Sequence, residues 1–130
     1  MADETRQETQ AWLRKAGNDL RSARVDLDAA PPLVEDALFH CQQAAEKAMK
    51  AFLTAHGIVF RKTHDLDELA AACERIDASL KGTLDPARDL TDFAWEFRYP
   101  GSDEAPPESE ARDSLLLAQA AVDAIRERLK

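Results

Sequence analysis

The residues of this chain that could do chemistry gather in one run, His40 to Lys50, which reads HCQQAAEKAMK. A histidine, a glutamate and two lysines could supply a proton-transfer group and positive charges for a phosphate. At helical spacing, Glu46 and Lys50 also suit an i,i+4 ion pair that would only support the helix. Periodicity alone favours this second interpretation, in which the run is the solvated side of a helix.

A second candidate is the pair Arg98 and Tyr99 in the sequence RYPG. A guanidinium suits bidentate contact with a phosphate, and the neighbouring tyrosine ring offers a flat face for a base. We expect His64 and Lys47 to be their companions in a weak nucleotide or phosphate site. Two structural roles compete with this one. Arg98 could bind the last carbonyls of its helix, and His64 could orient the loop beside a helix cap at Asp65.

Other catalytic and metal-binding patterns are missing from the sequence, which has no Gly-rich phosphate loop, paired-carboxylate signature, HExxH or nucleophile motif. The two cysteines, Cys41 and Cys73, stand in no metal-ligand spacing. Each falls on the apolar stripe of a predicted helix, so we expect buried thiols rather than a disulfide or a zinc site. We therefore expect no catalytic residue, no metal and no cofactor.

The elements that position these residues are predicted to be helices. Of the 130 residues, 45% are hydrophobic and 32% charged, with a single Tyr, a composition that favours helix over sheet. Apolar residues recur at steps of three and four in five segments, with boundaries near Pro32, Gly57, Asp65, Asp85 and Pro107. The fourth segment is predicted to run from Asp85 to Phe97. Short connections favour antiparallel neighbours, so we expect one domain over residues 1–130, an all-α up-and-down bundle of four to five helices.

The second predicted helix, from near Pro32 to His56, is central to this bundle. Its apolar stripe is rich in alanine, which allows neighbouring helices to approach closely. Phe39 and Leu53 instead lie on a strip that is otherwise polar and that also carries Glu46. Large apolar groups on a polar side suggest a partner surface, so these three residues are the candidates for a dimer contact.

Charge and hydropathy restrict the class of function. The chain has 17 basic and 25 acidic residues and a formal net charge of −8, which makes stand-alone nucleic-acid binding improbable. The opening MADETRQETQ does not resemble a signal peptide, and no apolar run approaches the length of a membrane span. We expect a cytoplasmic protein without membrane contact.

Three segments together, ALFHCQQAAEKAMKAFLTAHG, THDLDEL and RYP, resemble the HEPN (higher eukaryotes and prokaryotes nucleotide-binding) domain family over most of the chain. The resemblance implies an antiparallel helical bundle that commonly dimerises. It also implies one of two activities. Some members bind nucleotides or work beside a minimal nucleotidyltransferase, in pairs of the toxin–antitoxin kind, whereas others are metal-independent ribonucleases acting as toxins or in defence.

The ribonucleases of that family use an Arg followed, after four to six residues, by a His. Here Arg98 is the natural candidate, but the three positions where the His should fall are Asp103, Glu104 and Ala105. The pair Arg61 and His64 is too closely spaced and lies in the wrong loop. We therefore expect a non-catalytic binding or regulatory module, with a nucleotide or a nucleotidyltransferase as its partner. Two alternatives remain open: a ribonuclease toxin in which His64 or His40 approaches Arg98 in space, and a purely structural dimerising bundle.

Overall fold

The chain is helical throughout most of the residues that the computed structural model describes, which are 1–90 and 106–130. The helices are α1 (Asp3–Asp28), α2 (Val34–Ala55), α3 (Leu66–Ile76), α4 (Lys81–Ala87) and α6 (Glu108–Arg128), with a 3-10 turn at Ala78–Leu80 before α4. No strand occurs in these two ranges, so the predicted all-α class is confirmed. Among the described helices, none has the length and apolar character needed to cross a membrane.

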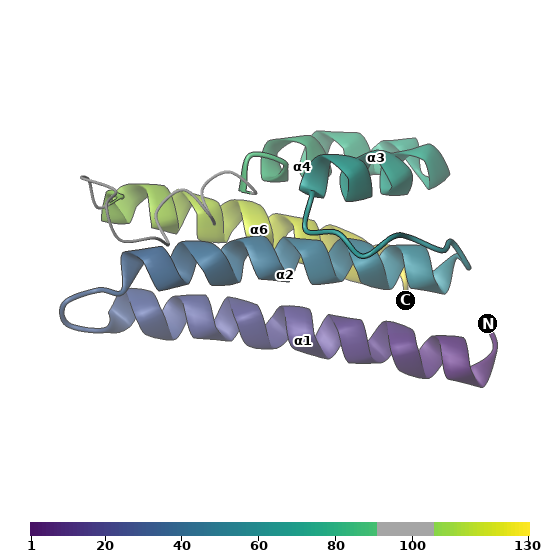
Figure 1. The fold of residues 1–130 in the computed structure, drawn as a ribbon, viewed down its shortest axis with the longest axis horizontal. Helices are drawn as coiled ribbons and strands as arrows, with labels where there is room; N and C mark the ends of the chain where they lie inside the picture. The colour runs from purple at the N-terminus through teal and green to yellow at the C-terminus, as the bar shows by residue number, and fades with distance from the viewer. Residues whose placement is uncertain (91–105) are drawn as a thin grey trace.

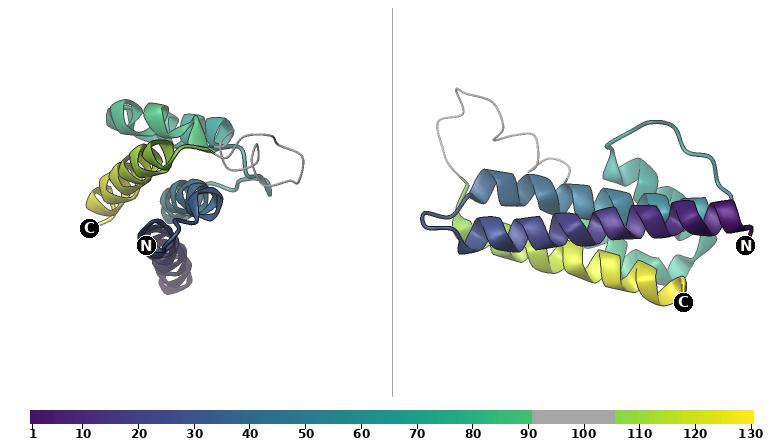
Figure 2. Two further views of the ribbon diagram at one scale, coloured as in Figure 1. Left: turned by 90° about the vertical axis from the view of Figure 1, so that its left-hand side faces the viewer. Right: turned by 90° about the horizontal axis from the view of Figure 1, so that it is seen from below.

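The helices lie in three layers, which the end-on view in Figure 2 separates clearly. α1 forms one outer layer, α2 and α6 form the middle layer, and the short helices α3 and α4 cover the other side. α1 and α2 are an antiparallel hairpin, and α6 runs antiparallel to α1 (Figure 1). α2 therefore has neighbours on several sides, because α1, α3 and α6 all pack against it.

The hairpin of α1 and α2 is held by the apolar stripes that the sequence predicts. Along α1 the buried residues recur at steps of three and four, and α2 meets them with small side chains. These residues are Leu13, Ala16, Leu20, Ala23 and Leu27 on α1, and Ala37, Cys41, Ala44, Ala48 and Ala51 on α2. Met49 and Phe52 fill the space that the alanines leave. Close packing of this kind makes the central helix a rigid support for polar side chains.

Both ends of the connection between α2 and α3 are fixed by local backbone chemistry. Gly57 has φ +69°, and the amides of Gly57 and Ile58 donate to the carbonyls of Thr54 and Leu53 at 3.1 and 2.9 Å. This left-handed cap ends α2 as predicted. At the start of α3 the Asp65 side chain accepts from the amide of Asp67 at 2.9 Å, which confirms the predicted N-cap.

The cap at Asp65 is not extended into a capping box, in which Glu68, three residues later, would accept from the amide of Asp65. Glu68 accepts instead from the guanidinium of Arg61 at 2.7 Å. The Asp65 amide donates to the hydroxyl of Thr63 at 3.0 Å. An exposed cation within reach of the carboxylate has displaced the backbone amide as the partner of Glu68.

The predicted start of the fourth helix near Asp85 is wrong. α4 already begins at Lys81 and ends at Ala87, with Asp85 and Pro86 inside it, and a turn follows at residues 88 and 89. The reason is that Leu80, Leu84 and Ala87, which recur at steps of four and three, are all buried, so apolar spacing extends the helix toward the N-terminus. The later part of the predicted helix, residues 91–97, lies outside the described residues.

The two cysteines occupy the core, as expected. Cys41 and Cys73 are free and buried, and burial raises the pKa of each thiol to about 12. A thiol with such a pKa stays protonated at neutral pH and is neither a nucleophile nor a metal ligand.

Candidate functional site

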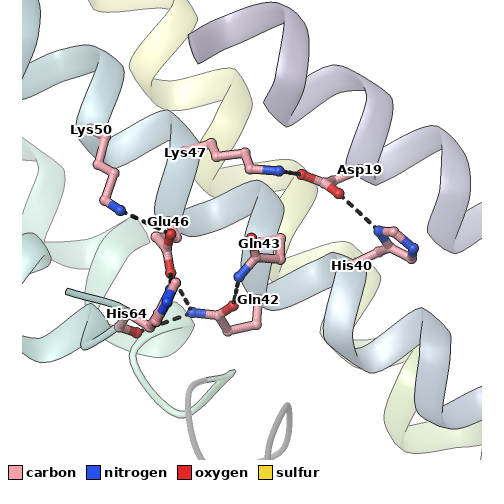
Figure 3. Close-up of polar contacts among 8 residues, drawn as sticks. All are labelled: Asp19, His40, Gln42, Gln43, Glu46, Lys47, Lys50 and His64. Atoms are coloured by element: carbon pink, nitrogen blue, oxygen red, sulfur yellow. Dashed lines mark hydrogen bonds and ion pairs between the residues drawn. The ribbon is translucent and has the colours of Figure 1, made fainter. Parts of the chain in front are cut away.

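Two polar clusters surround α2, and we name each by its central residue. The Glu46 cluster consists of Gln42, Gln43, Glu46 and Lys50 on α2 and His64 in the connection to α3. The His40 cluster consists of Asp19 and Asp26 on α1 and Asp36, His40 and Lys47 on α2. Figure 3 shows most of both sets and the different directions in which they point.

Glu46 is the centre of a saturated hydrogen-bond network although its side chain is buried. The residue is 2% exposed, and its Oε2 accepts from Nζ of Lys50 at 3.0 Å. Its Oε1 lies 2.9 Å from Nδ1 of His64 and 3.1 Å from Nε2 of Gln42 (Figure 3). A carboxylate only accepts, so Nδ1 of His64 is the donor. Three donors on one carboxylate offset the large penalty of removing its charge from water.

The partners of Glu46 are themselves held in place. Gln42 also donates to the backbone carbonyl of His64 at 3.1 Å, and Gln43 donates to Oε1 of Gln42 at 2.7 Å. The ammonium of Lys50 lies over two rings as well, 5.5 Å from the centroid of Trp12 and 5.9 Å from that of Phe60. The network thus binds the connection before α3 to the central helix through both its side chain and its backbone.

This arrangement corrects the interpretation of the polar strip as a solvated side. Gln42, Glu46 and Lys50 are all buried, and Leu53, on the same strip, is 0% exposed. α3 packs on α2, and the connection before it is bonded to this side of the helix, so the strip lies inside the chain. Leu53 and Glu46 are therefore not surface residues of this chain. Of the three candidates for a dimer contact, only Phe39 is partly exposed, with its ring 5.6 Å from that of His40.

The predicted phosphate-site residues do not form one group among the described residues. The side chain of His64 is 62% exposed and rests on the buried Glu46. Lys47 points toward α1, away from His64, and its Nζ is 2.6 Å from Oδ2 of Asp19 (Figure 3). Its charge is neutralised there, so Lys47 can join a site at His64 only by leaving Asp19. Arg98 and Tyr99 lie outside the described residues.

The His40 cluster is built across the hairpin of α1 and α2. Oδ1 of the buried Asp19 lies 2.8 Å from Nδ1 of His40, while Oδ2 of Asp36 lies 3.5 Å from Nε2 of the same ring. Asp26 completes the cluster from α1. One carboxylate oxygen of Asp26, one of Asp36 and one ring nitrogen of His40 lie within 4.8 Å of one another. A pocket of about 460 Å³ opens beside these three residues.

Asp26 is the member of this cluster whose buried carboxylate is least compensated by its surroundings. It is 8% exposed, and within the described part of the chain its Oδ2 has no hydrogen-bond partner. Burial, together with the hydrogen bond and the charge of the adjacent Asp36 carboxyl, raises the pKa of Asp26 to about 6, against the opposing effect of His40. At neutral pH the folded protein thus holds an ionised carboxylate that its surroundings disfavour.

Sequence reasoning missed the α1 members of the cluster. Asp36, His40 and Lys47 are visible as one polar strip of α2 from their spacing. Asp19 and Asp26 are seven residues apart and interrupt the apolar stripe of α1, next to Leu20 and Leu27. Two carboxylates inside an apolar stripe are the signal that could have found the site, because such residues are rarely buried without a partner.

We expect Asp26→Asn to stabilise the metal-free protein at neutral pH. The pKa of Asp26 is about 6 in the folded state, above its ordinary value of 3.8, so its contribution to stability is full below pH 4 and is lost as the pH rises through 6. The amide does not ionise. At pH 7.5 the variant should gain up to about 3 kcal/mol in unfolding free energy, at roughly 1.4 kcal/mol per pKa unit.

Urea unfolding in EDTA buffer between pH 4 and 7.5 measures this difference. It should vanish near pH 4, where wild-type Asp26 is also neutral. Asp28→Asn, the same substitution at an exposed position of the same helix, is the control and should change little at any pH. A gain that is equal at all pH values would contradict the assigned cause.

Comparison with known families gives one finding. The model of the HEPN domain family matches residues 9–128, nearly the whole chain. Comparison with curated proteins gave no match, and comparison with solved structures gave none either.

Proposed function

This chain belongs to the HEPN domain family, and on that premise we propose that it is a non-catalytic binding module. The family supports a nucleotide-binding or ribonuclease-like module in general. We place this chain on the binding side because its sequence has Asp103, Glu104 and Ala105 where a ribonuclease would have the His that follows Arg98. An Arg without a positioned proton-transfer group does not cleave RNA.

The observation that carries the proposal is the support beneath His64. Its imidazole is largely exposed, yet Nδ1 is fixed at 2.9 Å from a carboxylate that is buried and held by Lys50. The backbone of His64 is fixed by Gln42 as well. An exposed side chain whose orientation is fixed by a hydrogen bond to a buried group is preorganised for a ligand, because it has little conformational freedom to lose on binding.

The proposed ligand is a nucleotide or another phosphate, held by His64 together with Arg98 and Tyr99. The guanidinium of Arg98 suits the phosphate, and the ring of Tyr99 suits the base. We further propose that the chain acts as one domain, forms a homodimer, and pairs with a minimal nucleotidyltransferase in a toxin–antitoxin-like system. A small nucleotidyltransferase gene beside this one would support that pairing.

Calorimetric titration with ATP, GTP and AMP tests the nucleotide site. We expect wild-type protein to bind with modest affinity that weakens as salt rises, since the net charge of −8 confines positive potential to a local patch. His64→Ala and Arg98→Ala should each weaken binding at least tenfold. Arg14→Ala, which removes an exposed arginine on α1, is the control and should bind as the wild type does.

Two results would contradict the proposal. No heat with any nucleotide, or equal binding by all variants, would remove His64 and Arg98 from a ligand site. Cleavage of mixed RNA substrates that is lost in Arg98→Ala would instead favour the ribonuclease alternative, with a histidine distant in sequence as the partner of Arg98.

A further inference from the structure

Three groups that normally accept hydrogen bonds face one another at the His40 cluster. They are the carboxylates of Asp26 and Asp36 and the ring of His40, and one oxygen or nitrogen atom from each lies within 4.8 Å of the others. Asp36 and His40 are four residues apart on α2, so their side chains project from one face of the helix. Asp26 reaches them from α1 across the hairpin. Converging acceptors repel unless a positive charge lies between them.

The orientation of His40 is set by Asp19. Nδ1 of His40 lies 2.8 Å from Oδ1 of Asp19, and Oδ2 of the same carboxylate accepts from Nζ of Lys47 at 2.6 Å. In the tautomer that carries its proton on Nδ1, the ring donates to Asp19 and presents the lone pair of Nε2 toward Asp36. A histidine that binds a metal through one ring nitrogen usually donates its other ring N–H to a carboxylate or a carbonyl. This hydrogen bond fixes the tautomer and the orientation of the ring.

Asp26 provides an independent observation. The residue is more than nine-tenths buried, and no hydrogen-bond donor among the described residues serves its Oδ2. A second proton on His40 would reach Asp36 only over 3.5 Å, a long distance for a charged hydrogen bond, and would leave Asp26 unserved. One divalent ion could satisfy all three groups at once.

We propose that Asp26, Asp36 and His40 bind a single divalent ion of the first transition row, of which Zn²⁺ and Mn²⁺ are examples. The Nε2 to Oδ2 separation of 3.5 Å is close to the edge of about 3.4 Å expected between two ligands at tetrahedral Zn²⁺. The imidazole ligand favours such ions over Mg²⁺ and Ca²⁺, which take oxygen. This site shares no residue with the nucleotide site proposed above, and it departs from the expectation of no metal that was drawn from the sequence.

The pocket beside the three ligands leaves room for the remaining coordination positions. Its volume of about 460 Å³ accommodates waters or an oxygen of a small ligand, while Asp36 is half-exposed and gives the ion an entry path. Arg21 also lines this pocket, and its positive charge opposes the ion, so we expect micromolar rather than nanomolar affinity.

Titration of chelator-treated protein with ZnCl₂, without nucleotide, tests the proposal. We expect one ion per chain, and at least 30-fold weaker binding by Asp26→Asn and by His40→Gln. His56→Gln is the matched control, because it removes an exposed histidine near the other end of α2, and it should bind as the wild type does. Asp26→Asn is expected to be at least as stable as the wild type without metal, so its loss of binding would not be a loss of fold.

Titration with CoCl₂ identifies the ligands by absorption. Nitrogen and oxygen ligands give weak visible bands, whereas a thiolate adds an intense near-ultraviolet band, which we do not expect. Asp19→Asn should weaken binding about 10- to 100-fold through the orientation of His40, with the saturated spectrum unchanged. Absent binding, a thiolate band, or an equal loss in His56→Gln would each overturn the proposal.

Discussion

Replacement of Glu46 by alanine is expected to lower the free energy of unfolding by about 3–5 kcal/mol, because it leaves a buried ammonium without a counter-charge. Lys50 is buried and loses the carboxylate at 3.0 Å. Gln42 and His64 lose the same acceptor, so the connection before α3 also loses an anchor to α2. Chemical denaturation followed by circular dichroism measures the loss.

The chain contains a matched control for this change. Glu108 and Arg112 form an ion pair with the same i,i+4 spacing, at 2.9 Å, but both side chains are about half exposed. Glu108→Ala should therefore change stability by less than about 0.5 kcal/mol. The double variant Glu46→Ala with Lys50→Met should recover much of the loss, since it removes the buried charge. If Glu46→Ala cost no more than Glu108→Ala, the cluster would not stabilise the fold.

Leu53→Glu is expected to unfold the protein almost completely at 25 °C. The residue is 0% exposed, so the substitution removes core packing and places a carboxylate among the apolar side chains of the core. The two effects together amount to about 5 kcal/mol or more, which is comparable with the whole stability of a domain of this size. Loss of the far-ultraviolet helical signal and of a cooperative thermal transition would show it.

Leu116→Glu is the control for the same chemical change at a residue that is 70% exposed on α6, and it should stay within about 0.5 kcal/mol of the wild type. If the Leu53→Glu protein instead stayed folded and its oligomer had a different mass in solution from that of the wild type, Leu53 would again be a candidate for a contact between chains. Because Leu53 lies in the core, Phe39→Glu is the more informative test of the homodimer, with light scattering as its measurement.

Apolar spacing predicted the long helices well, because the α1 and α2 stripes meet each other directly. It failed for the polar strip of α2, and the reason is physical. Periodicity shows which side of a helix is apolar, whereas the burial of Glu46 and Lys50 depends on a segment that folds over them later in the chain. Polar residues that are buried and hydrogen-bonded to one another have the same helical spacing in the sequence as polar residues exposed to solvent.

The candidate sites show the same division. His64 is a candidate from sequence because the family string and the loop position both mark it, whereas its buried support by Gln42 and Glu46 could not be predicted. The convergence of Asp26 with Asp36 and His40 depends on the register between α1 and α2, which side-chain spacing within one helix does not determine. Lys47 was placed on the correct strip, yet its partner Asp19 lies on another helix.

The central position of α2 has a consequence for amide hydrogen exchange. Since α1, α3 and α6 all pack on this helix, its middle turns have no way to open while the rest of the domain stays folded. Deuterium uptake there should report global unfolding, whereas the short α3 and α4 should exchange by opening locally. A ligand at either polar cluster would then be accommodated by displacement of α1 or of the connection before α3, with α2 as the fixed reference for both.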